Sequence, residues 1–209
     1  MTSSRVVVHK RGKHVELEIG GVPILTSKLL GTERDFGRLA PASAKRVLVG
    51  GLGFGSTLGG VLERVGKDAH VIVVEKISEI ADLVEGELRR LTKGALDDPR
   101  VEIVRADVCD VIAREKDLDA ILLDVDNGPE WASFRTNARL YDARGLAAAK
   151  RALRDGGMWA VWSGYPVDAF ALRLRAAGFR TKVVPFVERG KLQARAYVGV
   201  KEGRGRRGR

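Results

Sequence analysis

The sequence has little of what builds disulfide-bonded, metal-binding or membrane proteins. Its single cysteine, Cys109, excludes an internal disulfide framework and indicates a reducing compartment. Its three histidines are scattered and make no metal-ligand spacing, so we expect no metal site. No apolar run approaches the roughly 20 residues that cross a bilayer, and Met1–Lys13 lacks the apolar segment of a secretory signal. We therefore expect a cytoplasmic protein with no membrane partner.

The formal net charge of +10 suggests a nucleic-acid-binding protein, but much of this charge lies at the C-terminus. Residues 201–209 hold five basic side chains and one acidic side chain. This Gly/Arg segment has too few apolar side chains to pack, so we expect a disordered basic tail. Its expected role is to keep the protein soluble, and the alternative is a weak contact with nucleic acid or another polyanion.

Residues 1–42 are expected to form a small N-terminal β unit and a linker. Segments 5–9 and 14–19 have the pattern of short strands, and a Gly-Gly turn signal leads from the second into residues 22–25. An amphipathic segment over 32–39 then connects this unit to the main domain.

Residues 43–200 alternate between short apolar runs and helical stretches, which predicts a parallel sheet covered on both faces. Two further strand-like segments, 179–186 and 194–200, then follow without a helix between them. They predict a terminal hairpin whose last strand runs antiparallel to its neighbours. The expected fold is α/β, a Rossmann-like class I methyltransferase fold. The earlier expected strands lie at 46–50, 70–75, 101–105, 120–124 and 158–162, and the expected helices at 56–65, 77–91, 142–153 and 169–177.

A glycine-rich loop, G-G-L-G-F-G-S-T, directly follows the first strand of this domain. Gly51, Gly53 and Gly55 let the backbone approach a ligand, and free N–H groups at the helix start favour polar or anionic groups. Glu75 ends the next strand, 22 positions after Gly53, where an acid can accept hydrogen bonds from both ribose hydroxyls. The G-x-G-x-G pattern suits S-adenosylmethionine better than a dinucleotide, whose loop would have glycine or alanine at Ser56. The alternatives are a dinucleotide loop and a purely structural turn.

Acidic residues also follow the third and fourth strands of the domain. In this fold Asp107 can reach the adenine amino group while Val108 packs on the ring, and a helix N-cap at Asp107 is a compatible alternative. Asp124 and Asp126 lie at the carboxyl edge of the sheet, where ligands bind. They can bind a cationic amine or deprotonate it for nucleophilic attack. The alternative is a simple turn, because Asp-Asn-Gly-Pro has turn chemistry.

Four aromatic side chains are candidates for the wall of an acceptor pocket, and the alternative for each is ordinary core or rim packing. They are Trp131, Tyr141, Trp162 and Tyr165.

Residues 45–163 resemble the spermidine synthase family, the polyamine aminopropyltransferases. The resemblance rests on the glycine loop ending in Thr-Leu, on Val-Glu75, on Leu-Asp-Asp-Pro-Arg-Val-Glu over 96–102 with Asp107, and on Leu-Leu-Asp124 with the following Gly-Pro. It implies a small β domain ahead of the catalytic one. It also implies that Glu75 holds the ribose, that Asp107 holds the adenine, and that Asp124 helps to deprotonate the attacking amine.

The sequence departs from the family pattern at two acidic positions. Phe54 stands where the family's glycine loop has the acid that binds the aminopropyl ammonium. Asn127 stands where the family's catalytic loop has a second acid, for which Asp126 is the candidate substitute. The segment that shapes the family's polyamine pocket is also shortened. A loop with Phe54 instead resembles ordinary methyltransferases, whose backbone amides receive the methionine carboxylate.

These observations predict a transferase that moves an aminopropyl or methyl group from an S-adenosyl sulfonium to a small, amine-bearing acceptor. The donor is S-adenosylmethionine or decarboxylated S-adenosylmethionine. One alternative is an S-adenosylmethionine-dependent methyltransferase of a small molecule or nucleic acid, and another is a non-catalytic cofactor-binding relative. Family analogy adds a possible homodimer through the N-terminal β unit.

Overall fold

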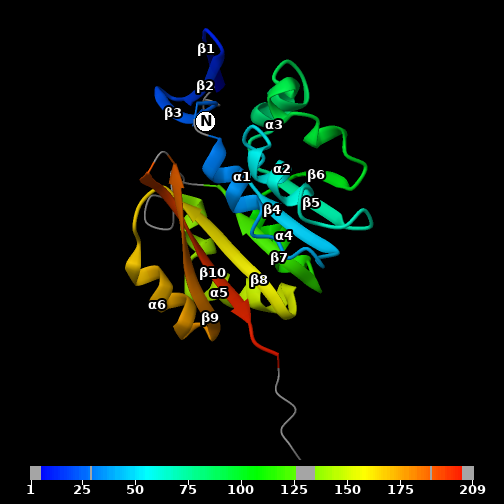
Figure 1. The fold of residues 1–209 in the computed structure, drawn as a ribbon, viewed down its shortest axis with the longest axis vertical. Coiled ribbons are helices and arrows are strands. Elements are labelled where there is room, and N and C mark those ends of the chain that lie inside the picture. Colours follow the sequence, from blue (N-terminus) through cyan, green and yellow to red (C-terminus); the bar gives the residue numbers. More distant parts are fainter. Residues whose placement is uncertain (1–5, 29, 126–134, 189, 204–209) are drawn as a thin grey trace, which may run out of the picture.

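Two separate β-sheets organise the chain in the computed structural model, which describes residues 6–28, 30–125, 135–188 and 190–203. The smaller sheet is antiparallel, with the strand order β1-β2-β3, and lies at one end of the molecule (Figure 1). Its strands are β1 (Val6–Arg11), β2 (His14–Ile19) and β3 (Val22–Thr26). The three strands expected near the N-terminus are therefore present.

The larger sheet has the strand order β6-β5-β4-β7-β8-β10-β9. The first five strands of this order, from β6 through β5, β4 and β7 to β8, are parallel. Strand β10 runs antiparallel to both β8 and β9. The expected terminal hairpin and the Rossmann-like methyltransferase layout are thus confirmed. The strands are β4 (Arg46–Gly50), β5 (His70–Glu75), β6 (Val101–Arg105), β7 (Leu118–Leu123), β8 (Leu153–Ser163), β9 (Phe179–Glu188) and β10 (Lys191–Lys201).

The chain turns from one half of this sheet to the other at β4. Strand β4 pairs with β5 on one side and with β7 on the other. The connections that leave β4 and β7 therefore diverge at their carboxyl ends, and such a switch point is where open α/β sheets bind ligands.

Helices cover both faces of the sheet because successive side chains of its strands alternate between two cores. Val47 and Val49 of β4 belong to one core and Leu48 to the other. The first core includes side chains from α1 (Gly31–Gly37), α2 (Ser56–Leu62) and α3 (Ser78–Glu85), and the second includes side chains from α4 (Val108–Arg114), α5 (Ala143–Ala152) and α6 (Asp168–Ala176).

The helix expected over 77–91 is shorter than predicted. Helix α3 ends at Glu85, and Gly86 adopts φ −100° and ψ −113°, which is outside the helical region. Glycine is a poor helix former because it loses more backbone entropy than other residues. The chain continues as two 3₁₀ turns, η1 (Arg89–Thr92) and η2 (Ala95–Asp97), while a third, η3 (Arg135–Leu140), precedes α5.

Helix α1, which the sequence indicated only as an amphipathic linker, packs tightly on α2. A Cβ atom on Gly60 would lie 2.0 Å from the carbonyl oxygen of Arg34, and one on Gly37 would lie 2.1 Å from that of Thr57. Only glycine permits so close an approach of the two backbones. Arg34 of α1 and Arg38, the C-cap of α1, also form ion pairs with Glu63, the C-cap of α2. These contacts fix where the side chains of α1 lie.

The C-terminal strand extends one residue into the segment expected to be a tail. Lys201 is the last residue of β10, and its ammonium group donates a hydrogen bond to the Leu153 carbonyl at 2.6 Å. Residues 204–209 lie outside the described residues, so the disorder of that segment stays a prediction. Within the described ranges, no helix combines the length and the apolar character that crossing a membrane requires.

Candidate functional site

The glycine-rich loop lies against the ends of two neighbouring strands. The Gly51 N–H donates to the Val74 carbonyl at 2.9 Å, at the end of β5. Gly51 has φ +91°, and a Cβ atom there would lie 2.2 Å from the carbonyl oxygen of Asp124. Glycine is therefore required at position 51 for two reasons: the backbone is in the left-handed region, and a side chain would collide with the neighbouring backbone. Gly53 follows in the same loop, and Gly55 is the N-cap of α2.

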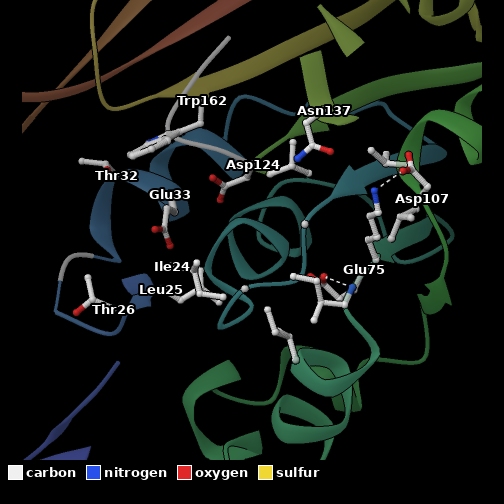
Figure 2. A pocket seen from close by; sticks show the side chains of 18 of the residues that line it. Ile24, Leu25, Thr26, Thr32, Glu33, Glu75, Asp107, Asp124, Asn137 and Trp162 are labelled. Atoms are coloured by element: carbon white, nitrogen blue, oxygen red, sulfur yellow. Dashed lines mark hydrogen bonds and ion pairs between the residues drawn. The ribbon is translucent and has the colours of Figure 1, made fainter. Parts of the chain in front are cut away.

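A cavity of about 370 Å³ opens beside this loop at the carboxyl ends of the parallel strands (Figure 2). Its volume is within the usual range for small-molecule sites. The cavity brings together most of the residues that the sequence indicated, namely Gly51, Gly53, Glu75, Asp107, Val108 and Asp124. Gly55 is not among the described residues that line it. Asp126 lies outside the described residues, so its assignment stays a prediction.

Glu75 connects the glycine loop to the loop after β5. One carboxylate oxygen accepts a hydrogen bond from the Leu52 N–H at 3.2 Å, and the other accepts one from the Ile77 N–H at 2.8 Å. Burial raises the pKa of this carboxyl, and the backbone hydrogen bonds oppose that rise. The carboxylate has about four acceptor sites in all, and the backbone N–H groups of Leu52, Ile77 and Lys76 use at most three of them. Glu75 can therefore accept further hydrogen bonds from hydroxyl groups in the cavity.

Asp107 is the N-cap of α4 and accepts a hydrogen bond from the Cys109 N–H at 2.9 Å. It also forms ion pairs with Lys76 and Arg139, each at 2.8 Å. Burial favours the neutral acid, but hydrogen bonds from these three partners more than offset it, so the pKa of Asp107 is lowered. The capping alternative weighed for this residue is present in the structure, and its contact with adenine stays a prediction.

Asp124 faces a second carboxyl group that the sequence did not single out. Its side chain accepts a hydrogen bond from the Thr57 hydroxyl at 2.6 Å. Glu33 of α1 lies beside it in the cavity (Figure 2). Burial raises the pKa of Asp124 to about 6, against the opposing hydrogen bond from Thr57. Burial and then the charge of Asp124 raise the pKa of Glu33 to about 9. Ionisation of Asp124 therefore makes ionisation of Glu33 less favourable.

The cavity is acidic although the chain is basic overall. Among the described residues, its lining has one basic side chain, Lys76, and five carboxyl side chains: Glu33, Glu75, Asp107, Asp124 and Glu188. Lys76 is already paired with Asp107. Low-dielectric walls concentrate the field of such charges, so the cavity attracts cations.

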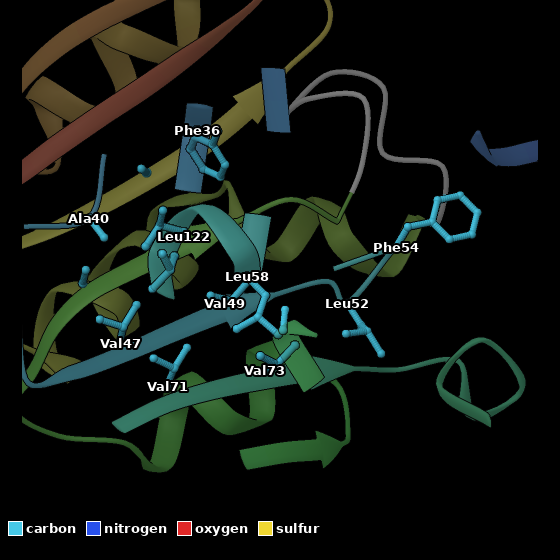
Figure 3. Packing of buried hydrophobic residues seen from close by; sticks show 14 of the residues in the cluster. Phe36, Ala40, Val47, Val49, Leu52, Phe54, Leu58, Val71, Val73 and Leu122 are labelled. Carbon is cyan, nitrogen blue, oxygen red and sulfur yellow. The ribbon is translucent and has the colours of Figure 1, made fainter. Parts of the chain in front are cut away.

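Phe54 is part of the hydrophobic core. It is 2% exposed, belongs to the same cluster as Leu52 and Leu58 (Figure 3), and is not among the described residues that line the cavity. The position at which the resemblance implied an ammonium-binding acid is thus used for apolar packing in this chain.

Only one of the four candidate aromatic residues is seen to wall the cavity. Trp162 lines it, whereas Tyr165 is 46% exposed and is not among its described lining residues. For Tyr141 the alternative of core packing holds, because this residue is 2% exposed and lies in the core on the other face of the sheet, where its ring packs edge-on against Phe170 with 5.8 Å between the ring centroids. Trp131 lies outside the described residues.

The sequence analysis missed the residues that reach the cavity from outside the Rossmann-like sheet. Ile24, Leu25 and Thr26 of β3 line it, as does Glu33 of α1. A single acid in an amphipathic helix is usually a solvated residue, so no local pattern distinguished Glu33. Thr57 is the second residue of α2, directly after the glycine loop. Its hydroxyl group at that position could have been recognised from the sequence as a candidate site residue.

The chain is similar to known proteins in both sequence and structure. No protein-family model matches the chain. Polyamine aminopropyltransferase 1 of Streptomyces coelicolor is 34% identical over 146 residues, which cover 65% of this chain and 26% of that protein. The polyamine aminopropyltransferase of Mycobacterium tuberculosis is 29% identical over 167 residues, which cover 77% of this chain and 31% of that protein. The chain thus spans less than a third of the length of these curated relatives.

The solved structures that match share the fold. Spermidine synthase from Thermotoga maritima superposes with a TM-score of 0.72 at 23% identity, over 97% of this chain and 71% of that one. An O-methyltransferase from the same organism, dependent on S-adenosylmethionine, superposes with a TM-score of 0.58 at 22% identity, over 83% and 66% of the two chains. Together with the sequence relatives, these likenesses show that the chain has a methyltransferase-like fold and is similar in sequence to polyamine aminopropyltransferases.

Proposed function

We propose that this protein transfers an alkyl group, aminopropyl or methyl, from an S-adenosyl sulfonium donor to a small acceptor that carries an amine. The observation that carries the proposal is the acidic cavity at the switch point of the sheet, whose described lining has five carboxyl side chains and one paired lysine. A sulfonium and an ammonium are both cations, so one acidic cavity attracts both reactants. The curated relatives are polyamine aminopropyltransferases, which agrees with this reading.

The lining residues fit an S-adenosyl group. The glycine loop lines the cavity at Gly51 and Gly53, where no side chain takes up space, and the Glu75 carboxylate can accept hydrogen bonds from ribose hydroxyls. Val108 and Ile77 supply apolar surface for a flat ring, next to Asp107. In the proposed complex these residues hold the nucleoside. A bound sulfonium supplies the activated carbon that the acceptor nitrogen attacks.

Asp124 is the proposed proton acceptor for the acceptor nitrogen. Its pKa of about 6 leaves it largely ionised near neutral pH yet basic enough to take a proton. The hydrogen bond from Thr57 fixes the orientation of its carboxylate. Positioning of the nucleophile and removal of its proton are the two contributions that such a displacement needs from the protein.

Direct calorimetric titration of the two donors tests this proposal. We expect the full-length protein to bind decarboxylated S-adenosylmethionine more tightly than S-adenosylmethionine, because an acidic cavity disfavours the extra carboxylate of the latter. The reverse preference would assign methyl transfer, the second candidate function, which the burial of Phe54 and the O-methyltransferase neighbour favour. Failure of both donors to bind would refute the proposed function.

Asp124→Asn is expected to lower turnover at least about 100-fold while it changes donor affinity by less than about threefold, because general-base catalysis contributes roughly 10²–10⁴. The amide keeps the shape of the carboxylate but cannot accept the proton. Turnover and donor affinity are measured on the same preparation, with the exposed Asp110→Asn as the matched control. Unchanged turnover in Asp124→Asn would make Asp124 a turn residue only.

A further inference from the structure

Two carboxyl groups at the α1 end of the cavity, those of Glu33 and Asp124, have no cationic partner in the part of the chain that the structure describes. Two other acids of this chain with little exposure are each paired with a base, Asp98 with Arg100 at 2.7 Å and Asp119 with Arg154. Within the described ranges, the side chain of Asp124 has Thr57 as its hydrogen-bond partner, and the carboxyl group of Glu33 has no hydrogen bond or ion pair. Burying charge without a partner is unfavourable, so a bound cation would stabilise the ionised form of both carboxyl groups.

The position of Glu33 is fixed by the packing of helix α1. The close contact of Gly60 with the Arg34 backbone holds the first turns of α1 on α2. The Thr57 hydroxyl, which hydrogen-bonds Asp124 at 2.6 Å, also lies 3.3 Å from the Glu33 carbonyl oxygen. Arg34, the next residue, is turned toward Glu63 and does not neutralise the pair. The two carboxyl groups are therefore placed by the fold and not by attraction between them.

We propose that Glu33 and Asp124 bind one primary ammonium group of the ligand between them, and that Glu33 releases its proton to solvent when that cation arrives. Glu33 is then a specificity-determining residue that selects amines over neutral molecules. The charge of Asp124 and burial keep Glu33 protonated in the empty cavity at neutral pH. A cation between the carboxyl groups reverses both effects, because an opposite charge within a few ångströms favours the ionised acid.

The surroundings favour an ammonium ion. Trp162 of β8 lies beside the two acids, and aromatic rings next to carboxylates are a common environment for ammonium groups (Figure 2). Among the described residues, no group of three or more potential metal ligands occurs, which argues against a divalent metal at this pair. The remaining charged groups of the lining are Glu188 from β9 and, by the glycine loop, Glu75, Lys76 and Asp107. Lys76 is held by Asp107, so no base among the described lining residues competes for the pair.

The test measures proton release on binding, which does not depend on catalysis. 1,4-Diaminobutane is titrated into the full-length protein near neutral pH, in two buffers with different ionisation enthalpies, with and without 5′-methylthioadenosine. We expect release of up to about one proton per diamine bound, because the carboxyl group of Glu33 changes from neutral to ionised. Glu33→Gln should abolish this release and weaken the diamine at least about tenfold. Glu33→Asp should retain proton release with weaker binding.

The control is Glu79→Gln, the same chemical change at an exposed residue of α3, which should behave as the wild type. The neutral 1,4-butanediol should not compete. Absence of diamine binding, or wild-type proton release in Glu33→Gln, would overturn the inference. The inference rests on the proposed function for the identity of the ligand, but the two fail separately. If 5′-methylthioadenosine does not bind while diamine binding still depends on Glu33, the transferase assignment falls and the ammonium site stands.

Discussion

Glu75→Gln is expected to weaken the binding of 5′-methylthioadenosine by about 100-fold or more, since charged hydrogen bonds contribute roughly 1.5–3 kcal/mol each. The carboxylate accepts hydrogen bonds from the Leu52 and Ile77 N–H groups, and in the proposed complex its remaining lone pairs accept those of the ribose hydroxyls. A glutamine has one accepting oxygen, so its NH₂ group would face one of these backbone donors. The substitution thus removes the charged acceptor and also disturbs the glycine loop.

Two measurements separate these effects. Calorimetry gives the affinity for 5′-methylthioadenosine, and thermal unfolding without ligand shows whether the loop defect destabilises the protein. Glu79→Gln, an identical change on the exposed face of α3, is the matched control and should bind the nucleoside normally. An affinity of Glu75→Gln within twofold of the wild type would remove Glu75 from the nucleoside site.

The free energy of unfolding is expected to decrease as the pH rises from about 5 to about 9, by more in the wild type than in Glu33→Gln. The pKa of Glu33 is raised to about 9 by burial and by Asp124, so the folded protein holds a proton that the unfolded chain has lost. A proton bound only in the folded state stabilises it below the unfolded pKa, and this stabilisation disappears as the pH approaches the folded pKa. The pKa of Asp124 is raised to about 6, so this group also lowers the free energy of unfolding as the pH rises, over a lower pH range.

Urea unfolding of the two proteins near pH 5.5 and near pH 8.5 tests this expectation. The ideal slope is about 1.4 kcal/mol per pH unit for one group. We therefore expect Glu33→Gln to gain up to about 4 kcal/mol relative to the wild type across these three pH units. The comparison between variants cancels the general effect of net charge, which both share. Parallel pH profiles for the two proteins would show that Glu33 is ionised in the folded state.

The order of strands and helices was largely predictable because each element is marked locally. Val47, Leu48 and Val49 are apolar in succession, as a strand buried on both faces requires, and they indeed contribute to both cores. The absence of a helix between β9 and β10 predicted the antiparallel hairpin. The end of α3 was missed because the apolar pattern continues beyond Gly86, and the conformation of that glycine depends on its surroundings.

The sequence by itself determined the fold class and the half of the site that follows the strands. Glu75, Asp107 and Asp124 were found because parallel strands bring their carboxyl ends to one edge, so position along the chain predicts position in space. Only the tertiary structure decided that Glu33 faces Asp124. Glu33 reaches the cavity through the packing of α1 on α2, which depends on where glycines leave room for the backbone, and no local periodicity records such a long-range contact.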